Sequence, residues 1–364
     1  MACAALLTAC GVDLPDVRFT PMGSPDPAPN FAGLIVADEP EAATAAEKIL
    51  QARGDAADAA AALALALAVT LPSRAGLAAG GVCLTHDSSG TSEVRFPERV
   101  EAAADAPPLV RALATLQARS GRLRWPQVVA PAEALARFGT ATSHALAADL
   151  VTHGSVLLQD DQLLRTFMLP DHRLLATGDR FAQLALAEEF ADVRIHEPSG
   201  PAAEASVWHP VEPRSTMSGQ MFETSSVPSL AAATDASPDA GTAFAIGDAD
   251  GNVVACALTM GQPFGRGKIT AGYLLASSAN GSALAASIVI GPEDGQPRFA
   301  AATASGPALI ANALQAAEKS GRVGDVSAWF CPRNIVADGD RCDLLANRAR
   351  FGYGRVVTPL PPHT

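Results

Sequence analysis

The feature of the sequence that most restricts the fold is an alanine- and leucine-rich run at residues 56–70, AADAAAALALALAVT. Asp55 precedes this run and can accept hydrogen bonds from the backbone N–H groups of a first helical turn, so the run is predicted to be a helix. Because the run is apolar on nearly every side of a helix, this helix has to be buried on most of its faces. The rest of the chain must therefore surround it.

A β-hairpin is predicted in the second half of the chain. Residues 242–247 and 253–258 are apolar, and the turn between them reads DADGN. A polar segment without periodicity, residues 226–241, precedes the first strand and is typical of a flexible or cleavable linker. A strand that begins at a hydroxyl residue behind such a linker suggests an N-terminal nucleophile hydrolase. In that class, chain cleavage frees a Thr or Ser that acts as nucleophile and supplies its own α-amine as base. An ordinary turn between two strands is the simpler interpretation.

Composition excludes several classes of protein. The 364 residues suffice for one large domain or two modest ones, and 48% of them are hydrophobic. The net charge of −12, without a run of Lys or Arg, excludes a nucleic-acid partner, which needs a basic surface. No segment has the length and apolarity of a membrane span. No spacing of Cys and His indicates a metal site, and no cofactor is expected.

The N-terminus indicates export. Residues 1–10 end in LTAC, which resembles a bacterial lipobox in which Cys10 carries a lipid, although the charged segment expected before it is missing. Residues 11–31 are then a tether. The protein is accordingly expected in the bacterial periplasm, attached to a membrane only through the lipid on Cys10. The alternative is an alanine-rich terminus that only frays.

The other cysteines support this location. Cys331 and Cys342 flank a polar loop and are predicted to form a disulfide in an oxidising compartment. Cys83 and Cys256 lie inside apolar strands and are predicted to be buried thiols.

The predicted elements place strands on both sides of a helical middle. This order favours an α+β fold in which helices lie outside packed sheets. Residues 192–240 are predicted to be irregular. Strands are predicted at residues 33–37, 82–86, 93–96, 242–247, 253–258, 285–290, 298–303, 334–336 and 350–357. Helices are predicted at residues 41–52, 56–70, 109–120, 126–138, 143–150, 179–189 and 307–319.

Several stretches together resemble the γ-glutamyltransferase (glutathione hydrolase) family. They are GDAADAA at residues 54–60, LPSRAGLAAGG at 71–81, the helical region 109–150, FAIGDADGNVVACALTMGQPFGRG at 244–267, and SALAASIVIGPEDGQPRFAAATASGPALIANALQ at 282–315. The resemblance implies the four-layer αββα sandwich of N-terminal nucleophile hydrolases, truncated in the large-subunit region. It divides one composite domain into a large-subunit-like part at 32–191, a linker and deletion region at 192–240, and a small-subunit-like part at 241–364.

The family's catalytic residues are mostly replaced in this chain. The family's nucleophile is the first of two consecutive threonines, and it falls on Gly241, which has no side chain; the second falls on Thr242. Neighbouring strand residues point to opposite faces, so Thr242 is expected to be an ordinary strand threonine unless a bulge turns it. Thr242 as nucleophile is the alternative. Thr259 matches the threonine that supports the nucleophile.

The substrate contacts are reduced as well. The family's carboxylate-binding Arg falls on Pro97, although the neighbouring Glu98 matches. Ser282 alone is left of a substrate-binding Ser–Ser pair. The two glycines of the oxyanion hole fall on Ser305 and Gly306, whose backbone N–H groups can still point inward.

These replacements predict a γ-glutamyltransferase-like protein without transferase or hydrolase activity, a pseudoenzyme whose ligand is a γ-glutamyl compound or another small amide. One alternative is an active amide hydrolase or γ-glutamyl transferase that cleaves itself before Thr242. Another is a membrane-tethered binding or adaptor protein. The sequence leaves the oligomeric state open.

Overall fold

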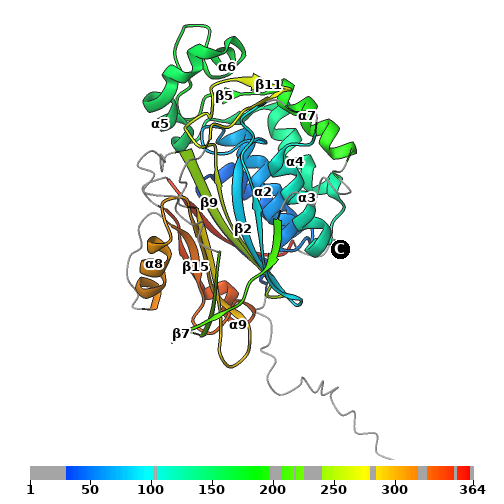
Figure 1. Cartoon of the computed structure of the whole chain (residues 1–364), viewed down its shortest axis with the longest axis vertical. Coiled ribbons are helices and arrows are strands. Elements are labelled where there is room, and N and C mark those ends of the chain that lie inside the picture. The colour runs from blue at the N-terminus through cyan, green and yellow to red at the C-terminus, as the bar shows by residue number, and fades with distance from the viewer. Residues whose placement is uncertain are drawn as a thin grey trace, which may run out of the picture.

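The chain folds into four layers in the order helix, sheet, sheet, helix (Figure 1). The structure is a computed structural model. It describes residues 30–101, 103, 105–196, 198, 207–216, 219–224, 240–278, 284–318, 326–347 and 351–360.

The first sheet is built from segments of both halves of the chain. Its strand order is β17–β1–β9–β10–β2–β3–β6, and neighbouring strands are antiparallel. The β9–β10 hairpin lies at the centre, with β1 on one side and β2 on the other. The strands are β1 (Gly33–Ala37), β2 (Gly80–Asp87), β3 (Gly90–Phe96), β6 (Val207–Pro210), β9 (Gly241–Asp248), β10 (Val253–Thr259) and β17 (Tyr353–Val357).

The second sheet packs against the first and has the strand order β16–β15–β14–β13–β8–β7. Apolar side chains, from small to aromatic, fill the space between the sheets, among them Ala245, Ile288 and Trp329. Helix α8 (Ala308–Glu318) covers the outer face of the second sheet. The strands are β7 (Arg214–Thr216), β8 (Gly219–Glu223), β13 (Ala285–Ile290), β14 (Pro297–Thr303), β15 (Ser327–Phe330) and β16 (Asp343–Leu345).

The alanine-rich helix α2 (Ala56–Thr70) is buried along its whole length, as its composition predicts. It packs against β9 and β10 on one side. Its other neighbours are α1 (Pro40–Gln51), α3 (Pro108–Ser120) and α4 (Trp125–Phe138). Asp55 and Asp58 form a capping box at its N-terminus, which satisfies backbone N–H groups that the helix itself cannot pair.

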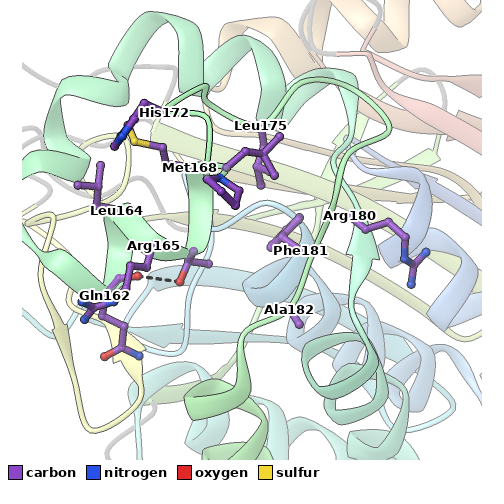
Figure 2. A pocket seen from close by; sticks show the side chains of 12 residues that line it. Gln162, Leu164, Arg165, Met168, His172, Leu175, Arg180, Phe181 and Ala182 are labelled. Atoms are coloured by element: carbon purple, nitrogen blue, oxygen red, sulfur yellow. Dashed lines mark hydrogen bonds between the residues drawn. The ribbon is translucent and has the colours of Figure 1, made fainter.

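Short helices and two small ribbons form the end of the molecule farthest from α9 in Figure 1. A pocket lies there between α6 and β5 (Figure 2). The elements are β4 (Thr140–Ala141), α5 (His144–His153), the 3-10 helix η1 (Gly154–Gln159), α6 (Asp161–Phe167), β5 (Arg180–Phe181), α7 (Leu184–Ile195), β11 (Ile269–Thr270) and β12 (Tyr273–Leu274).

The structure corrects several predicted elements. Residues 179–189, predicted as one helix, contain β5 and only the start of α7. Residues 334–336, predicted as an edge strand, begin α9 (Ile335–Asp338), because Asn334 accepts a hydrogen bond from the Ala337 N–H and caps the helix. The described part of 192–240, predicted to be irregular, contains β6, β7 and β8. These strands pair with partners distant in sequence, which a local pattern does not reveal.

The prediction of two buried thiols in the first sheet is wrong. Cys83 and Cys256 are buried, but they lie directly opposite each other on β2 and β10 and form a disulfide, with Cα atoms 4.1 Å apart. The strand register makes the disulfide possible, because two cysteines can be bridged only when their Cα atoms lie within about 7 Å of each other.

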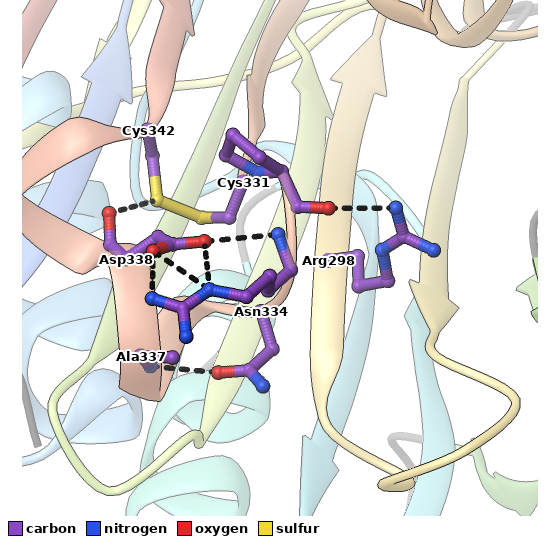
Figure 3. The surroundings of a disulfide bond; sticks show 8 residues. Arg298, Cys331, Asn334, Ala337, Asp338 and Cys342 are labelled. Carbon is purple, nitrogen blue, oxygen red and sulfur yellow. Dashed lines mark hydrogen bonds and ion pairs between the residues drawn. A yellow bond between two sulfur atoms is a disulfide. The ribbon is translucent and has the colours of Figure 1, made fainter. Parts of the chain in front are cut away.

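Cys331 and Cys342 form a second disulfide, which encloses α9 (Figure 3). Asp338 in this loop binds Arg333 in an ion pair of 2.6 Å.

Within the described residues, no helix is both long enough and apolar enough to cross a membrane.

Candidate active centre

The position matched to the family's nucleophile lies where β9 begins. Gly241 is the first residue of β9 and pairs directly with Thr259, the last residue of β10. Both face the second sheet, where Ala304 follows the end of β14. The structure therefore brings together Gly241, Thr259 and the segment that contains Ser305 and Gly306.

Gly241 leaves no space for a nucleophilic side chain. A Cβ atom at this residue would lie 2.5 Å from the Cβ of Ala304 and 3.0 Å from the carbonyl oxygen of Leu258. Carbon atoms in packed protein interiors do not approach so closely, so a threonine here would have to displace its neighbours. The methyl group of Ala304 occupies the space in which a side chain of residue 241 would lie.

Thr242 has its side chain on the opposite face of the sheet. It pairs with Leu258, whose side chain belongs to the core under the helices, and it is fully buried. Its hydroxyl group donates a hydrogen bond of 3.0 Å to Oδ2 of Asp38. The backbone N–H of Ala243 donates to the same oxygen at 3.3 Å. The Thr242 hydroxyl is thus bound to a buried carboxylate.

Asp38, which follows β1, is a residue that the sequence analysis missed. Its Oδ1 accepts a hydrogen bond of 3.2 Å from the hydroxyl of Ser327 on β15, and its Oδ2 binds Thr242 on β9. The carboxylate therefore connects the two sheets at the end where β9 begins. Its only signal in the sequence is a polar residue directly after a buried strand.

Thr259 fixes the backbone around the candidate centre. Its hydroxyl group donates to the carbonyl oxygen of Ala240 at 3.3 Å and accepts from the Gly261 N–H at 3.0 Å. The Met260 N–H also donates to the Ala240 carbonyl, at 3.0 Å. The carbonyl group of the peptide before Gly241 consequently accepts both of these hydrogen bonds.

The segment matched to the oxyanion hole has a different arrangement at each of its two residues. The Ser305 N–H donates to the hydroxyl of Thr303 at 3.0 Å, so this N–H group is engaged within its own segment. Gly306 has a φ of +110°, a backbone conformation that side chains disfavour. Both residues are half-buried.

The substrate contacts expected from the family are altered as well. Pro97 is exposed, and the half-buried Glu98 lies against Gly80, with Oε2 2.8 Å from the position of a Cβ there. Gly80 pairs with Thr259, so Glu98 is close to the end of β10. Arg99 does not replace the missing arginine, since its guanidinium binds Asp105 at 2.8 Å and also donates to neighbouring backbone carbonyls. Ser282 and Cys10 lie outside the described residues.

Acidic residues near the start of α2 accept hydrogen bonds from backbone N–H groups. Oδ1 of Asp55 accepts the Asp58 N–H, and Oδ2 of Asp248 accepts the Ala56 N–H at 3.0 Å. Burial raises the pKa of Asp55 to about 7, although the backbone hydrogen bond from Asp58 lowers it. In the described part of the chain, no cluster of His, Cys, Asp or Glu is arranged to hold a metal ion.

Comparisons with known proteins find similarity to glutathione hydrolases over part of the chain. The family model for γ-glutamyltranspeptidase matches residues 92–200. The glutathione hydrolase proenzyme of Escherichia coli (strain K12) is 28% identical over 191 residues, which are 46% of this chain and 33% of that protein. Glutathione hydrolase 7 of Mus musculus is 31% identical over 223 residues, which are 55% of this chain and 32% of that protein. The chain thus spans about a third of the length of the curated relatives that it matches.

Solved structures match the fold over most of the chain. The structure of LmbA2991HD has a TM-score of 0.59 at 14% identity and covers 84% of this chain and 87% of its own. Cephalosporin acylase from Bacillus halodurans has a TM-score of 0.53 at 17% identity, with coverage of 78% and 80%. The four-layer αββα sandwich is therefore a fold that this chain shares with these proteins. Over part of its length the chain is similar to the γ-glutamyltranspeptidase (glutathione hydrolase) family.

The packing at residue 241 can be tested by restoring a threonine. Gly241→Thr is expected to lower the free energy of unfolding by about 1–3 kcal/mol, the usual cost of adding groups to a packed core, because its Cβ would meet Ala304 at 2.5 Å. Urea denaturation measures the change. Adding Ala304→Gly to the same variant is expected to restore part of the loss. A single variant as stable as the wild type would contradict this account of the packing.

Proposed function

We propose that this protein is a member of the γ-glutamyltranspeptidase family that has lost the covalent step and binds a γ-glutamyl compound or another small amide without cleaving it. The observation that carries the proposal is the replacement of the nucleophile by Gly241, with the methyl group of Ala304 in the space of the missing side chain. Covalent catalysis in this class needs a hydroxyl or thiol at the start of that strand. A glycine supplies neither.

The altered substrate contacts support the same proposal. Pro97 has no group that can bind a carboxylate in the bidentate manner of an arginine. Arg99 is engaged in the adjacent loop. The positioning that makes a bound amide reactive is therefore reduced together with the nucleophile.

We also propose that the protein acts in the bacterial periplasm and is held at a membrane by a lipid on Cys10. The lipobox-like sequence before Cys10 motivates this proposal. Two disulfides in one chain, Cys83–Cys256 and Cys331–Cys342, support an oxidising compartment.

The purified full-length protein is expected to remain one intact polypeptide. Residue 241 has no hydroxyl that could attack the preceding peptide bond, and the Thr242 hydroxyl is buried against Asp38. Denaturing mass spectrometry after prolonged incubation measures this directly. The contrary result is cleavage of the wild type between Gly241 and Thr242 together with an intact chain in Thr242→Val. That result would contradict the proposal and identify a self-cleaving amide hydrolase.

Binding and turnover are then measured separately. Glutathione is expected to give heat in isothermal titration calorimetry, while γ-glutamyl-p-nitroanilide is expected to release no nitroaniline above the rate in buffer. Release of nitroaniline that Thr242→Val abolishes would show an active enzyme. If the protein neither binds glutathione nor releases nitroaniline, γ-glutamyl compounds are excluded as its ligands.

A further inference from the structure

The pocket between α6 and β5 combines apolar walls with cationic groups at its ends. It has a volume of about 670 Å³, within the range of roughly 300–1,000 Å³ typical of small-molecule sites. Figure 2 shows Arg165 on one side and Arg180 on the other, with Met168, Leu175 and Phe181 between them. The pocket lies outside the two-sheet sandwich that contains Gly241.

The walls of the pocket are held by hydrogen bonds and core packing. The chain after α6 folds back as a tight loop, in which the Leu169 N–H donates to the Arg173 carbonyl at 2.8 Å and the Leu175 N–H donates to the Phe167 carbonyl at 3.0 Å. On the opposite wall, Phe181 packs against Phe167 with ring centroids 5.5 Å apart. Backbone hydrogen bonds on one wall and the buried ring of Phe181 on the other therefore support the shape of the pocket.

The charge of the pocket is opposite to that of the whole chain. Its twelve lining residues include two arginines and one histidine but no Asp or Glu, whereas the protein has a net charge of −12. Among the nearby acidic residues, Asp171 and Asp179 are bound by Arg173, which lies outside the lining, at 3.8 and 2.6 Å. A local excess of positive charge in an acidic protein favours anions over cations.

The arginines differ in what they bind. The guanidinium of Arg180 donates to the carbonyl oxygen of Gly139 at 2.9 Å and is held in place. The guanidinium of Arg165 is exposed, and in the described part of the chain no hydrogen bond or ion pair fixes it, although it lies close enough to the Asp160 carboxylate to stabilise its charged form. Arg165 is thus the group that can offer its N–H donors to a ligand carboxylate.

We propose that this pocket is a second binding site, which takes a small carboxylate with an apolar body. The carboxylate binds Arg165 at the rim, and the apolar body lies against Met168, Leu175 and Phe181. Burial of apolar ligand surface supplies affinity, and the guanidinium supplies selectivity for an anion. The site is independent of the nucleophile position, so the proposed function and this inference can fail separately.

Decanoate is the probe that tests both parts of the site. The wild type is expected to bind decanoate in isothermal titration calorimetry, and to bind both 1-decanol and butanoate at least about tenfold more weakly, a difference of about 1.4 kcal/mol. The first comparison removes the charge, and the second removes most of the apolar body. Equal affinity for decanoate and decanol, or no decanoate binding at millimolar concentration, would overturn the proposal.

Variants assign the contact to the pocket. Arg165→Gln is expected to weaken decanoate binding about tenfold and to leave decanol binding unchanged, because only the charge-assisted contact is removed. Arg341→Gln is the matched control, since Arg341 is also exposed but lies in the loop closed by the Cys331–Cys342 disulfide. Met168→Glu is expected to abolish decanoate binding. Equal effects of Arg165→Gln and Arg341→Gln would place the anion elsewhere.

Discussion

Asp149→Asn is expected to lower the free energy of unfolding by about 3–5 kcal/mol, the cost of breaking a buried ion pair by removing one partner. Both oxygens of the Asp149 carboxylate bind the Arg74 guanidinium, at 2.7 and 2.8 Å. The hydroxyl of Ser73 donates to one of them at 2.5 Å. These side chains are nearly inaccessible to water, so the substitution leaves the Arg74 charge buried without this carboxylate.

The consequence extends toward the candidate centre. Asp149 lies on α5, and Ser73 and Arg74 lie in the loop after α2, so the ion pair joins these elements. The Ser73 carbonyl accepts the Phe264 N–H, which anchors the loop that follows β10. Urea denaturation measures the loss. Asp171→Asn, which affects an exposed pair with Arg173, is the control and is expected to leave the denaturation midpoint nearly unchanged. Equal effects of the two variants would contradict the prediction.

Glu39→Gln is expected to stabilise the protein above pH 7 and to flatten the dependence of its stability on pH. Glu39 is fully buried at the start of α1, where its Oε2 accepts the Ala42 N–H at 2.8 Å. Burial raises the pKa of Glu39 from 4.5 to about 7, against a smaller lowering by the hydrogen bond from Ala42. Each pKa unit corresponds to about 1.4 kcal/mol, so this carboxyl group destabilises the native state by about 3 kcal/mol at high pH.

The sign of the pH dependence follows from proton binding. Between pH 4.5 and about 7 the folded state keeps the Glu39 proton that the unfolded state has lost. The contribution of Glu39 to stability therefore falls as pH rises through this range and is constant above it. Urea denaturation at a series of pH values measures the difference in stability between the wild type and Glu39→Gln. Because Asp55 is present in both proteins, its own contribution to the pH dependence cancels in this difference. Glu188→Gln, at an exposed glutamate that does not influence the pKa of Glu39, is the control. An unchanged slope in Glu39→Gln would rule out this carboxyl group as the cause.

The elements that the sequence predicts best are those whose signal is local. The run of alanine and leucine in α2 predicts both a helix and its burial, since no face of that helix is polar enough for water. The turn DADGN predicts the β9–β10 hairpin, and Asp55 predicts the cap of α2. By contrast, β8 has little local signal and is a strand because it pairs with β13.

In the candidate active centre, too, some features are predicted by the sequence and others are shown only by the structure. The resemblance to the family predicts that Gly241 takes the position of the nucleophile, and strand alternation predicts that Thr242 points the other way. Neither observation reveals that Asp38 binds the Thr242 hydroxyl, or that Ala304 occupies the space next to Gly241. These contacts join residues far apart in the chain.

The sequence by itself therefore determined the buried helix, the central hairpin and the lack of a side chain at residue 241. Each depends on residue type and on short-range periodicity, which the sequence states directly. Only the tertiary structure decided the Cys83–Cys256 disulfide, the Ser73–Arg74–Asp149 network and the cationic pocket beside α6. The physical reason is that these depend on strand register and on the approach of distant segments, which are set by the packing of the whole core.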